Sequence, residues 1–292
     1  MQGTKKVLGR LATLEKKRGD VKLVHLIKFY HSSVGKKVVV GVTGLIMFLF
    51  LIAHMAGNLK AFLGQDAFDH YAASLRSIAE AFVGHGTVLW VSRIVLLLAV
   101  GLHILTVIQL SLRNRAARPV GYVKTRYRAA SFSARLMMVT GLTLLAFIVF
   151  HLLHLTTGSI RPGPFVEGRV YANVYGSFSR GWVLALYVVG VAVVAFHLYH
   201  GVWSLLQTLG LNNPDRERCT RGFSIVMSVL LFVGFCAMPV AVFTGVLPPP
   251  RPDVVRAQPY TGVIPGGDPA KSIDPLVKLS SANIAGVEAT TP

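Results

Sequence analysis

The sequence predicts an all-α membrane protein with five transmembrane helices. The chain of 292 residues is 53% hydrophobic and only 14% charged, whereas soluble globular domains carry about 25% charged residues. Five long runs lack Asp, Glu, Lys and Arg, and each is long enough to cross a bilayer, which takes about 20 residues of helix. These observations exclude an ordinary soluble domain.

Each predicted span follows the limits of its uncharged run. The fourth and fifth runs continue to Pro214 and Pro250, which is longer than a span, so they are shortened. The predicted helices are Val38–Leu59, Ile94–Leu112, Leu136–Ile160, 181–208 and 222–246.

The segments outside the spans have characters of their own. Residues 1–37 form a basic N-terminal segment, and residues 247–292 form a tail rich in Pro and Gly, for which we expect no regular structure. Apolar residues recur at helical spacing within 66–82, which predicts an amphipathic helix on the outer surface. No internal repeat is evident. Residues 38–246 are therefore expected to form one transmembrane domain.

The net charge of +18 is distributed unevenly along the chain. Most of the positive charge lies in residues 1–37, 113–135 and 209–221, which the five spans place on one side of the membrane. Because cytoplasmic segments are enriched in Lys and Arg, we expect a cytoplasmic N-terminus and an external C-terminus in a bacterial inner membrane. This asymmetry accounts for the basic balance, so no nucleic-acid partner is expected.

Histidines within the spans are the strongest chemical signal. Ionisable groups in membrane helices usually face the interior of the protein and carry function. They occur on the first four spans and not on the fifth. The six are His54, His103, His151, His154, His197 and His200.

The depths of these histidines fall into two levels. With a rise of about 1.5 Å per residue, His54 and His151 lie about 24 and 22 Å from the cytoplasmic end of their spans. His103 and His197 lie about 14 and 16 Å from it. We call the level of His54 and His151 the outer level and that of His103 and His197 the inner level. Two imidazoles at one height suit the two axial positions of a haem iron in a four-helix bundle, whereas zinc needs three or four ligands. Depth does not separate His151 from His154, nor His197 from His200, and a histidine proton relay is the alternative.

Several stretches resemble the cytochrome b558-type membrane anchor of succinate dehydrogenases and fumarate reductases. They are SSVGKKVVVGVTGLIMFLFLIAHMAGNLKAF, RLMMVTGLTLLAFIVFHLLH and VGVAVVAFHLYHGVWSLLQTLGL, with a less distinctive match in GLHILTVIQLSLRNR. The resemblance covers residues 31–246. It implies five helices and two b-type haems, with the first four helices forming a bundle around them. It also implies one axial ligand on each of those helices: His54 paired with His151, and His103 paired with His197.

The resemblance also implies partners and a role. A flavoprotein subunit, where succinate is oxidised, and an iron–sulfur subunit would dock on the cytoplasmic face, with a further small anchor subunit as an additional partner. Electrons would pass through the two haems to a membrane quinone, expected to be menaquinone. The alternatives are the b subunit of a hydrogenase or formate dehydrogenase, and a haem-free transporter.

Further residues are expected to line these sites. Arg93 begins an otherwise uncharged span and is expected to meet an outer-haem propionate. His154 and His200 are expected to hydrogen-bond a propionate, a water or a backbone carbonyl. Gly44 and Gly141 at the inner level, and Gly190 at the outer level, would let a porphyrin approach the backbone. The candidate quinone contacts are Asp69, His70, Tyr71 and Arg76 on the outer side and Ser33 and Lys36 on the inner side.

Overall fold

The structure, a computed structural model, describes residues 24–25, 27–117 and 132–251. The predicted basic segment 1–37 and the predicted tail 247–292 therefore lie largely outside the described residues. The described part is mostly helical.

Five helices of the described residues are long and apolar enough to cross a membrane, which confirms the predicted number of spans. Four of them begin in the polar flanks of their uncharged runs, since backbone hydrogen bonding does not stop where hydrophobicity stops, whereas the fourth has the predicted bounds. The first begins at Ser33 because the hydroxyl of Ser32 accepts the Gly35 N–H at 2.9 Å and caps it. The five are α2 (Ser33–Leu59), α5 (Thr87–Ala116), α6 (Phe132–His151), α8 (Gly181–Thr208) and α9 (Glu217–Phe243).

Short helices fill the connections. A 3-10 turn, Lys60–Leu63, follows α2, and a π-helical turn, Leu152–Thr156, follows α6. The predicted helix 66–82 is wrong in extent. Helix α3 (Gln65–Ser77) ends before Ala79, which adopts a left-handed backbone with φ 55°, and α4 (Glu80–Val83) is a separate turn. Helix α7 (Val170–Phe178) was not predicted.

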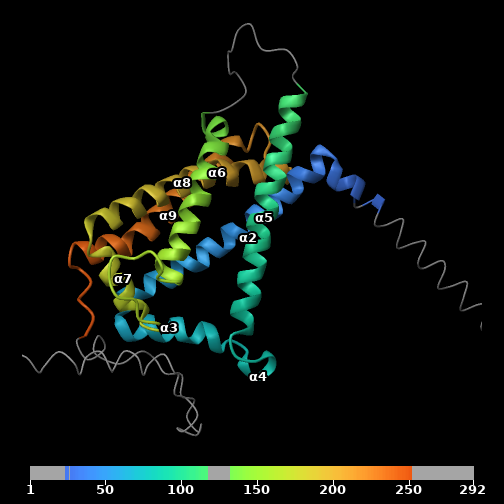
Figure 1. Cartoon of the computed structure of the whole chain (residues 1–292). Coiled ribbons are helices and arrows are strands. Elements are labelled where there is room, and N and C mark those ends of the chain that lie inside the picture. The colour runs from blue at the N-terminus through green and yellow to red at the C-terminus, as the bar shows by residue number, and fades with distance from the viewer. Residues whose placement is uncertain (1–23, 26, 118–131, 252–292) are drawn as a thin grey trace, which may run out of the picture. The chain divides into compact units, whose positions relative to one another are not determined.

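The long helices pack in a defined order. Helix α2 lies against α5, α8 and α9, while α8 also lies against α6 and α9 (Figure 1). Phe48 and Met55 of α2 meet Val202 of α8 and Leu231 of α9 in one apolar core. A second core joins α7 to α8 and α9 and includes Tyr171, Phe178, Val183, Tyr187 and Met238.

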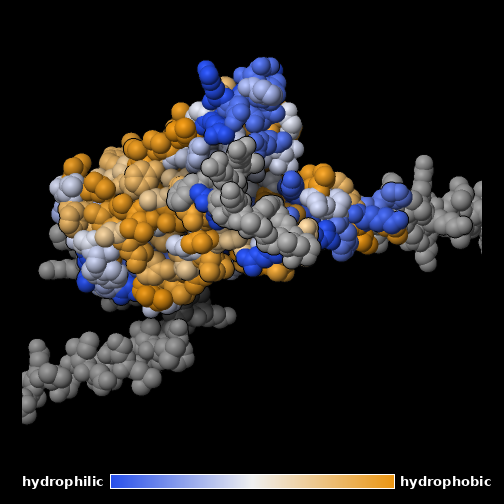
Figure 2. Space-filling model, turned by 90° about the horizontal axis from the view of Figure 1, so that it is seen from above, coloured by the Kyte–Doolittle hydropathy of each residue, from blue (hydrophilic) through white to orange (hydrophobic). Residues whose placement is uncertain are grey.

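Much of the helical surface is apolar and open. Leu97, Leu142 and Val189 are 72%, 70% and 63% exposed, and Figure 2 shows broad hydrophobic areas over the helices. Such surface is costly in water and stable in hydrocarbon. The five helices fit a multi-pass membrane protein.

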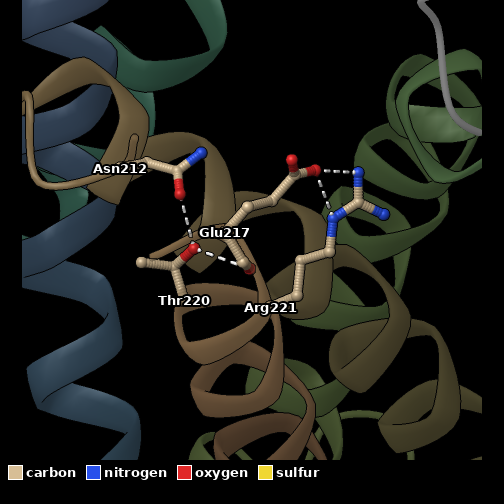
Figure 3. Close-up of polar contacts among 4 residues, drawn as sticks. All are labelled: Asn212, Glu217, Thr220 and Arg221. Atoms are coloured by element: carbon tan, nitrogen blue, oxygen red, sulfur yellow. Dashed lines mark hydrogen bonds and ion pairs between the residues drawn. The ribbon is translucent and has the colours of Figure 1, made fainter. Parts of the chain in front are cut away.

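The turn between α8 and α9 is fixed by polar contacts (Figure 3). Thr220 Oγ1 donates to Asn212 Oδ1 at 2.7 Å, and Arg221 Nε donates to Glu217 Oε1 at 2.9 Å. The Arg221 guanidinium also lies 4.5 Å from the centroid of the Trp203 ring. The contact between Arg221 and Trp203 joins α9 to α8, the helix that carries His197.

Candidate functional site: paired intramembrane histidines

The structure brings His54 of α2 and His151 of α6 together. Their ring centroids are 5.9 Å apart and their planes meet at 87°. Phe50 stacks on His54 with centroids 5.3 Å apart, and Phe235 of α9 lies on the same ring at 5.8 Å. This is the outer pair, and its two rings come from different helices.

His103 of α5 and His197 of α8 form the inner pair. The two rings are close enough to interact electrostatically. Each of these two rings lies against a helix that carries a histidine of the outer pair. A Cβ on Gly44 of α2 would lie 3.6 Å from Cε1 of His103, and one on Gly141 of α6 would lie 3.6 Å from Cε1 of His197. Gly44 and Gly141 therefore lie at the predicted inner level.

A threonine hydroxyl meets Nδ1 of each inner imidazole. Thr43 Oγ1 lies 3.1 Å from Nδ1 of His103, and Thr140 Oγ1 lies 3.0 Å from Nδ1 of His197. Each hydroxyl also lies within hydrogen-bond distance of a carbonyl of its own helix, since Thr43 Oγ1 is 2.7 Å from the Val39 oxygen and Thr140 Oγ1 is 3.1 Å from that of Leu136.

When the hydroxyl hydrogen is donated to that carbonyl, the threonine oxygen accepts a hydrogen from the imidazole. Nδ1 then carries the ring hydrogen, and in a neutral imidazole Nε2 carries the free lone pair. Metal-ligating histidines usually have this arrangement, in which the second ring nitrogen donates to an oxygen that fixes tautomer and orientation. The inner rings are thus prepared to coordinate through Nε2.

The geometry fits an iron porphyrin held by two imidazoles. With metal–imidazole bonds of about 2 Å, two rings on opposite sides of one metal have centroids about 6 Å apart, close to the 5.9 Å of the outer pair. No three His, Cys, Asp or Glu side chains of the described residues converge on one point. The assignment of haem ligands remains a prediction, and the donor arrangement suits it.

His154 makes a contact that the sequence did not predict. It is fully buried, and its Nδ1 lies 2.8 Å from the hydroxyl of Tyr187. The expected hydrogen bond from His154 to a propionate, a water or a backbone carbonyl stays a prediction. The Tyr187 hydroxyl also lies 3.4 Å from Nδ1 of His151. His200 lies against the Trp203 ring at 6.0 Å. Tyr187 thus bridges the two histidines of α6 and its π-helical turn.

The outer candidates for quinone and propionate contacts differ in their surroundings. Asp69 accepts the Tyr171 N–H at 2.8 Å and so fixes the start of α7, where burial raises the pKa of its carboxyl. Tyr71 packs on α2 at Gly57. Arg93 is exposed, with its guanidinium 4.9 Å from the centroid of the Trp90 ring.

Two further outer candidates lie on α3. His70 is exposed. Arg76 accepts the Gly86 N–H at 2.6 Å through its backbone carbonyl, an interaction that does not use the guanidinium.

The inner candidates differ from each other. Lys36 is buried, donates to Gln109 Oε1 and lies 4.1 Å from the Tyr30 ring centroid. Tyr30 also donates to Gln109 Oε1, at 3.1 Å. Ser33 is exposed at the start of α2. Gln109 was missed, because a single glutamine at the end of a span carries no distinctive signal.

A repeated motif places the two threonines. VTGL occurs at 42–45 and again at 139–142, and in each case a histidine follows the glycine by ten residues. The threonine of each motif precedes that histidine by eleven residues. Eleven residues of helix span about 17 Å, so α2 and α6 each carry an inner threonine and an outer histidine at the same separation. Comparisons of the chain with protein-family models, curated proteins and solved structures gave no match.

Proposed function

We propose that this chain is the membrane-anchoring cytochrome b subunit of a succinate:quinone oxidoreductase. His54 and His151 would hold an outer b-type haem, and His103 and His197 an inner one. Bound there, the haems would supply one-electron transfer between an iron–sulfur partner subunit and a membrane quinone. The observation that carries the proposal is the threonine hydroxyl within 3.1 Å of Nδ1 of each inner imidazole, a contact that leaves each Nε2 for a metal when Nδ1 is the donor.

The arrangement of the helices supports this proposal. Each pair takes one imidazole from the α2–α5 neighbours and one from the α6–α8 neighbours. A cofactor held between such helices would tie together segments that otherwise bury little surface against each other. In the most apolar segments of α2, α5 and α6, only 11%, 11% and 6% of the residues are buried.

The protein would also position its partners. The basic ends of α5 and α9 would lie on the cytoplasmic side, where the iron–sulfur and flavoprotein subunits dock, and the flavoprotein would oxidise succinate. The quinone, expected from the resemblance to be menaquinone, would bind within the membrane. A b subunit of a hydrogenase or formate dehydrogenase would share the spectrum and copurify with other partners.

Histidine variants of the purified chain test the assignment. We expect His103→Ala and His197→Ala each to lose one of two haems, the same one, because either change leaves the iron with a single protein ligand. The matched control is His200→Ala, one helical turn from His197, which keeps both. Two haems retained in both inner variants would disprove the ligand assignment.

The complex tests the partner. We expect His103→Ala to abolish electron transfer from succinate to quinone in membranes, while succinate oxidation with a soluble artificial acceptor persists. If no succinate-oxidising subunits copurify with the wild-type chain, the anchor role in this complex is wrong even where both haems are present.

A further inference from the structure

Two buried nitrogen atoms near the outer pair have no hydrogen-bond partner. They are Nε2 of His154 and Nε of Arg161. The two side chains interact electrostatically. Buried polar groups are normally paired, so an orphaned group requires an explanation. Two such groups within electrostatic range of each other can both donate to one ligand.

The hydrogen-bond order identifies the His154 nitrogen as a donor. If His151 coordinates through Nε2, its Nδ1–H donates to the Tyr187 oxygen at 3.4 Å. The Tyr187 O–H then donates to Nδ1 of His154 at 2.8 Å. His154 therefore carries its own hydrogen on Nε2, and this N–H needs an acceptor.

Arg161 is held through its two Nη atoms, while its buried Nε–H has no partner among the described residues. Nη1 donates to Asn173 Oδ1 and Nη2 to the Asn173 carbonyl, both at 2.9 Å. Asn173 is itself held by Val166, whose N–H donates to Oδ1 at 3.0 Å. Asn173 of α7 thus holds two of the five N–H groups of the guanidinium, and the Nε–H does not bond to it.

The charge favours an anion over a neutral acceptor. No ion pair among the described residues includes Arg161, and burial lowers the pKa of its guanidinium. A partly buried positive charge without a counter-charge is unfavourable, and a carboxylate would both neutralise it and accept its N–H. A quinone carbonyl would supply only the acceptor.

We infer that His154 and Arg161 form a binding site for a carboxylate, and that this carboxylate is a propionate of the outer haem. The inference rests on the proposed function and replaces Arg93 as the expected propionate partner. Arg93 is exposed and engaged with Trp90. His154 lies about one helical turn beyond His151, so the inferred carboxylate site is adjacent to the imidazole that would coordinate the outer haem.

Haem release from the purified full-length chain tests this site. The chain is loaded in haem-deficient cells with haem or with haem dimethyl ester, which lacks the carboxylates. Transfer to excess apomyoglobin is then timed. The outer haem is the phase that is absent from His54→Ala. We expect Arg161→Gln to accelerate release of the outer native haem by about tenfold or more, since charge-assisted hydrogen bonds are the strong ones.

The ester distinguishes a propionate contact from a structural role. With the ester, Arg161→Gln is expected to release the outer haem at the wild-type rate, because the interaction is already absent. Equal acceleration of both haem forms would overturn the inference, whether the anion is a lipid phosphate or the effect is structural. Arg93→Gln is the matched control and is expected to change neither rate.

The wild-type chain gives an independent measurement if Arg161→Gln binds no haem. We expect its outer site to release the ester at least about tenfold faster than native haem, and we expect Arg161→Lys, which retains the charge, to release native haem at an intermediate rate. Equal release of the two haem forms by the wild-type outer site would refute the carboxylate site. A wild-type chain that contains no haem would refute the proposed function itself, an outcome distinct from failure of the carboxylate site alone.

Discussion

Replacing Thr140 with valine removes a single hydroxyl that orients the inner imidazole of His197. Valine has nearly the shape of threonine, so packing against α8 is kept while the acceptor 3.0 Å from Nδ1 is lost. The Nδ1–H would then be left without its partner in a site where Thr140 itself is only 9% exposed.

Two estimates give the size of the effect. A buried donor left unpaired costs about 1–3 kcal/mol, and loss of an outer hydrogen-bond partner of a metal ligand typically lowers metal affinity by roughly 10–100-fold. Since about 1.4 kcal/mol corresponds to a factor of ten in an equilibrium constant, the two estimates agree. We therefore expect Thr140→Val to weaken inner-haem binding about tenfold or more and to leave the outer haem unchanged.

The assay is the rate of haem transfer from the purified chain to excess apomyoglobin, with the inner phase identified by its absence from His103→Ala. Thr143→Val is the matched control, because Thr143 lies on the same helix, is exposed, and bonds only the Val139 carbonyl. If Thr140→Val and Thr143→Val release both haems at the same rates, the threonine–imidazole bond does not hold the inner ligand.

Two further predictions concern the outer side. Because burial raises the pKa of Asp69, the folded chain holds this proton more tightly than the unfolded chain. Its contribution to stability is full below the ordinary carboxyl pKa of 3.8 and is lost as pH rises through the raised value. We expect Asp69→Asn, measured by thermal denaturation in detergent, to show a smaller fall in melting temperature from about pH 4 to pH 7; parallel profiles would contradict this. Gly190→Ala should destabilise the chain by about 1–3 kcal/mol, because its methyl group would overlap the Phe147 ring beside His151. Gly201→Ala on the same helix meets no atom within 4 Å and should be neutral; equal melting temperatures would refute the packing argument.

Composition predicted the spans because a membrane span depends on the length and hydrophobicity of one continuous run of residues. An uncharged run of sufficient length is enough, and the fourth helix ends at the predicted Thr208. Depth also predicted that the first and third spans supply the same histidine level, whereas the choice of His151 over His154 came from the resemblance. Depth depends only on the rise per residue, and His54 and His151 both lie far from the start of their runs.

Other features depended on tertiary contacts and could not be read from the sequence. Thr43 and Thr140 look like ordinary small residues of a membrane helix, and only the neighbouring α5 and α8 reveal that each faces a histidine. Arg93 was chosen for its place at the end of a span, whereas Arg161 follows a π-helical turn whose direction no pattern predicted. Helix α7 is short and depends on Asp69 from a distant segment.

The content of iron protoporphyrin in the purified wild-type chain tests the central claim most directly. We expect two haems per chain by pyridine haemochrome assay, with low-spin bis-imidazole signals in the electron paramagnetic resonance spectrum of the oxidised protein. A chain that is folded and contains no iron porphyrin would contradict the pairing of imidazoles around haem and would favour a histidine relay.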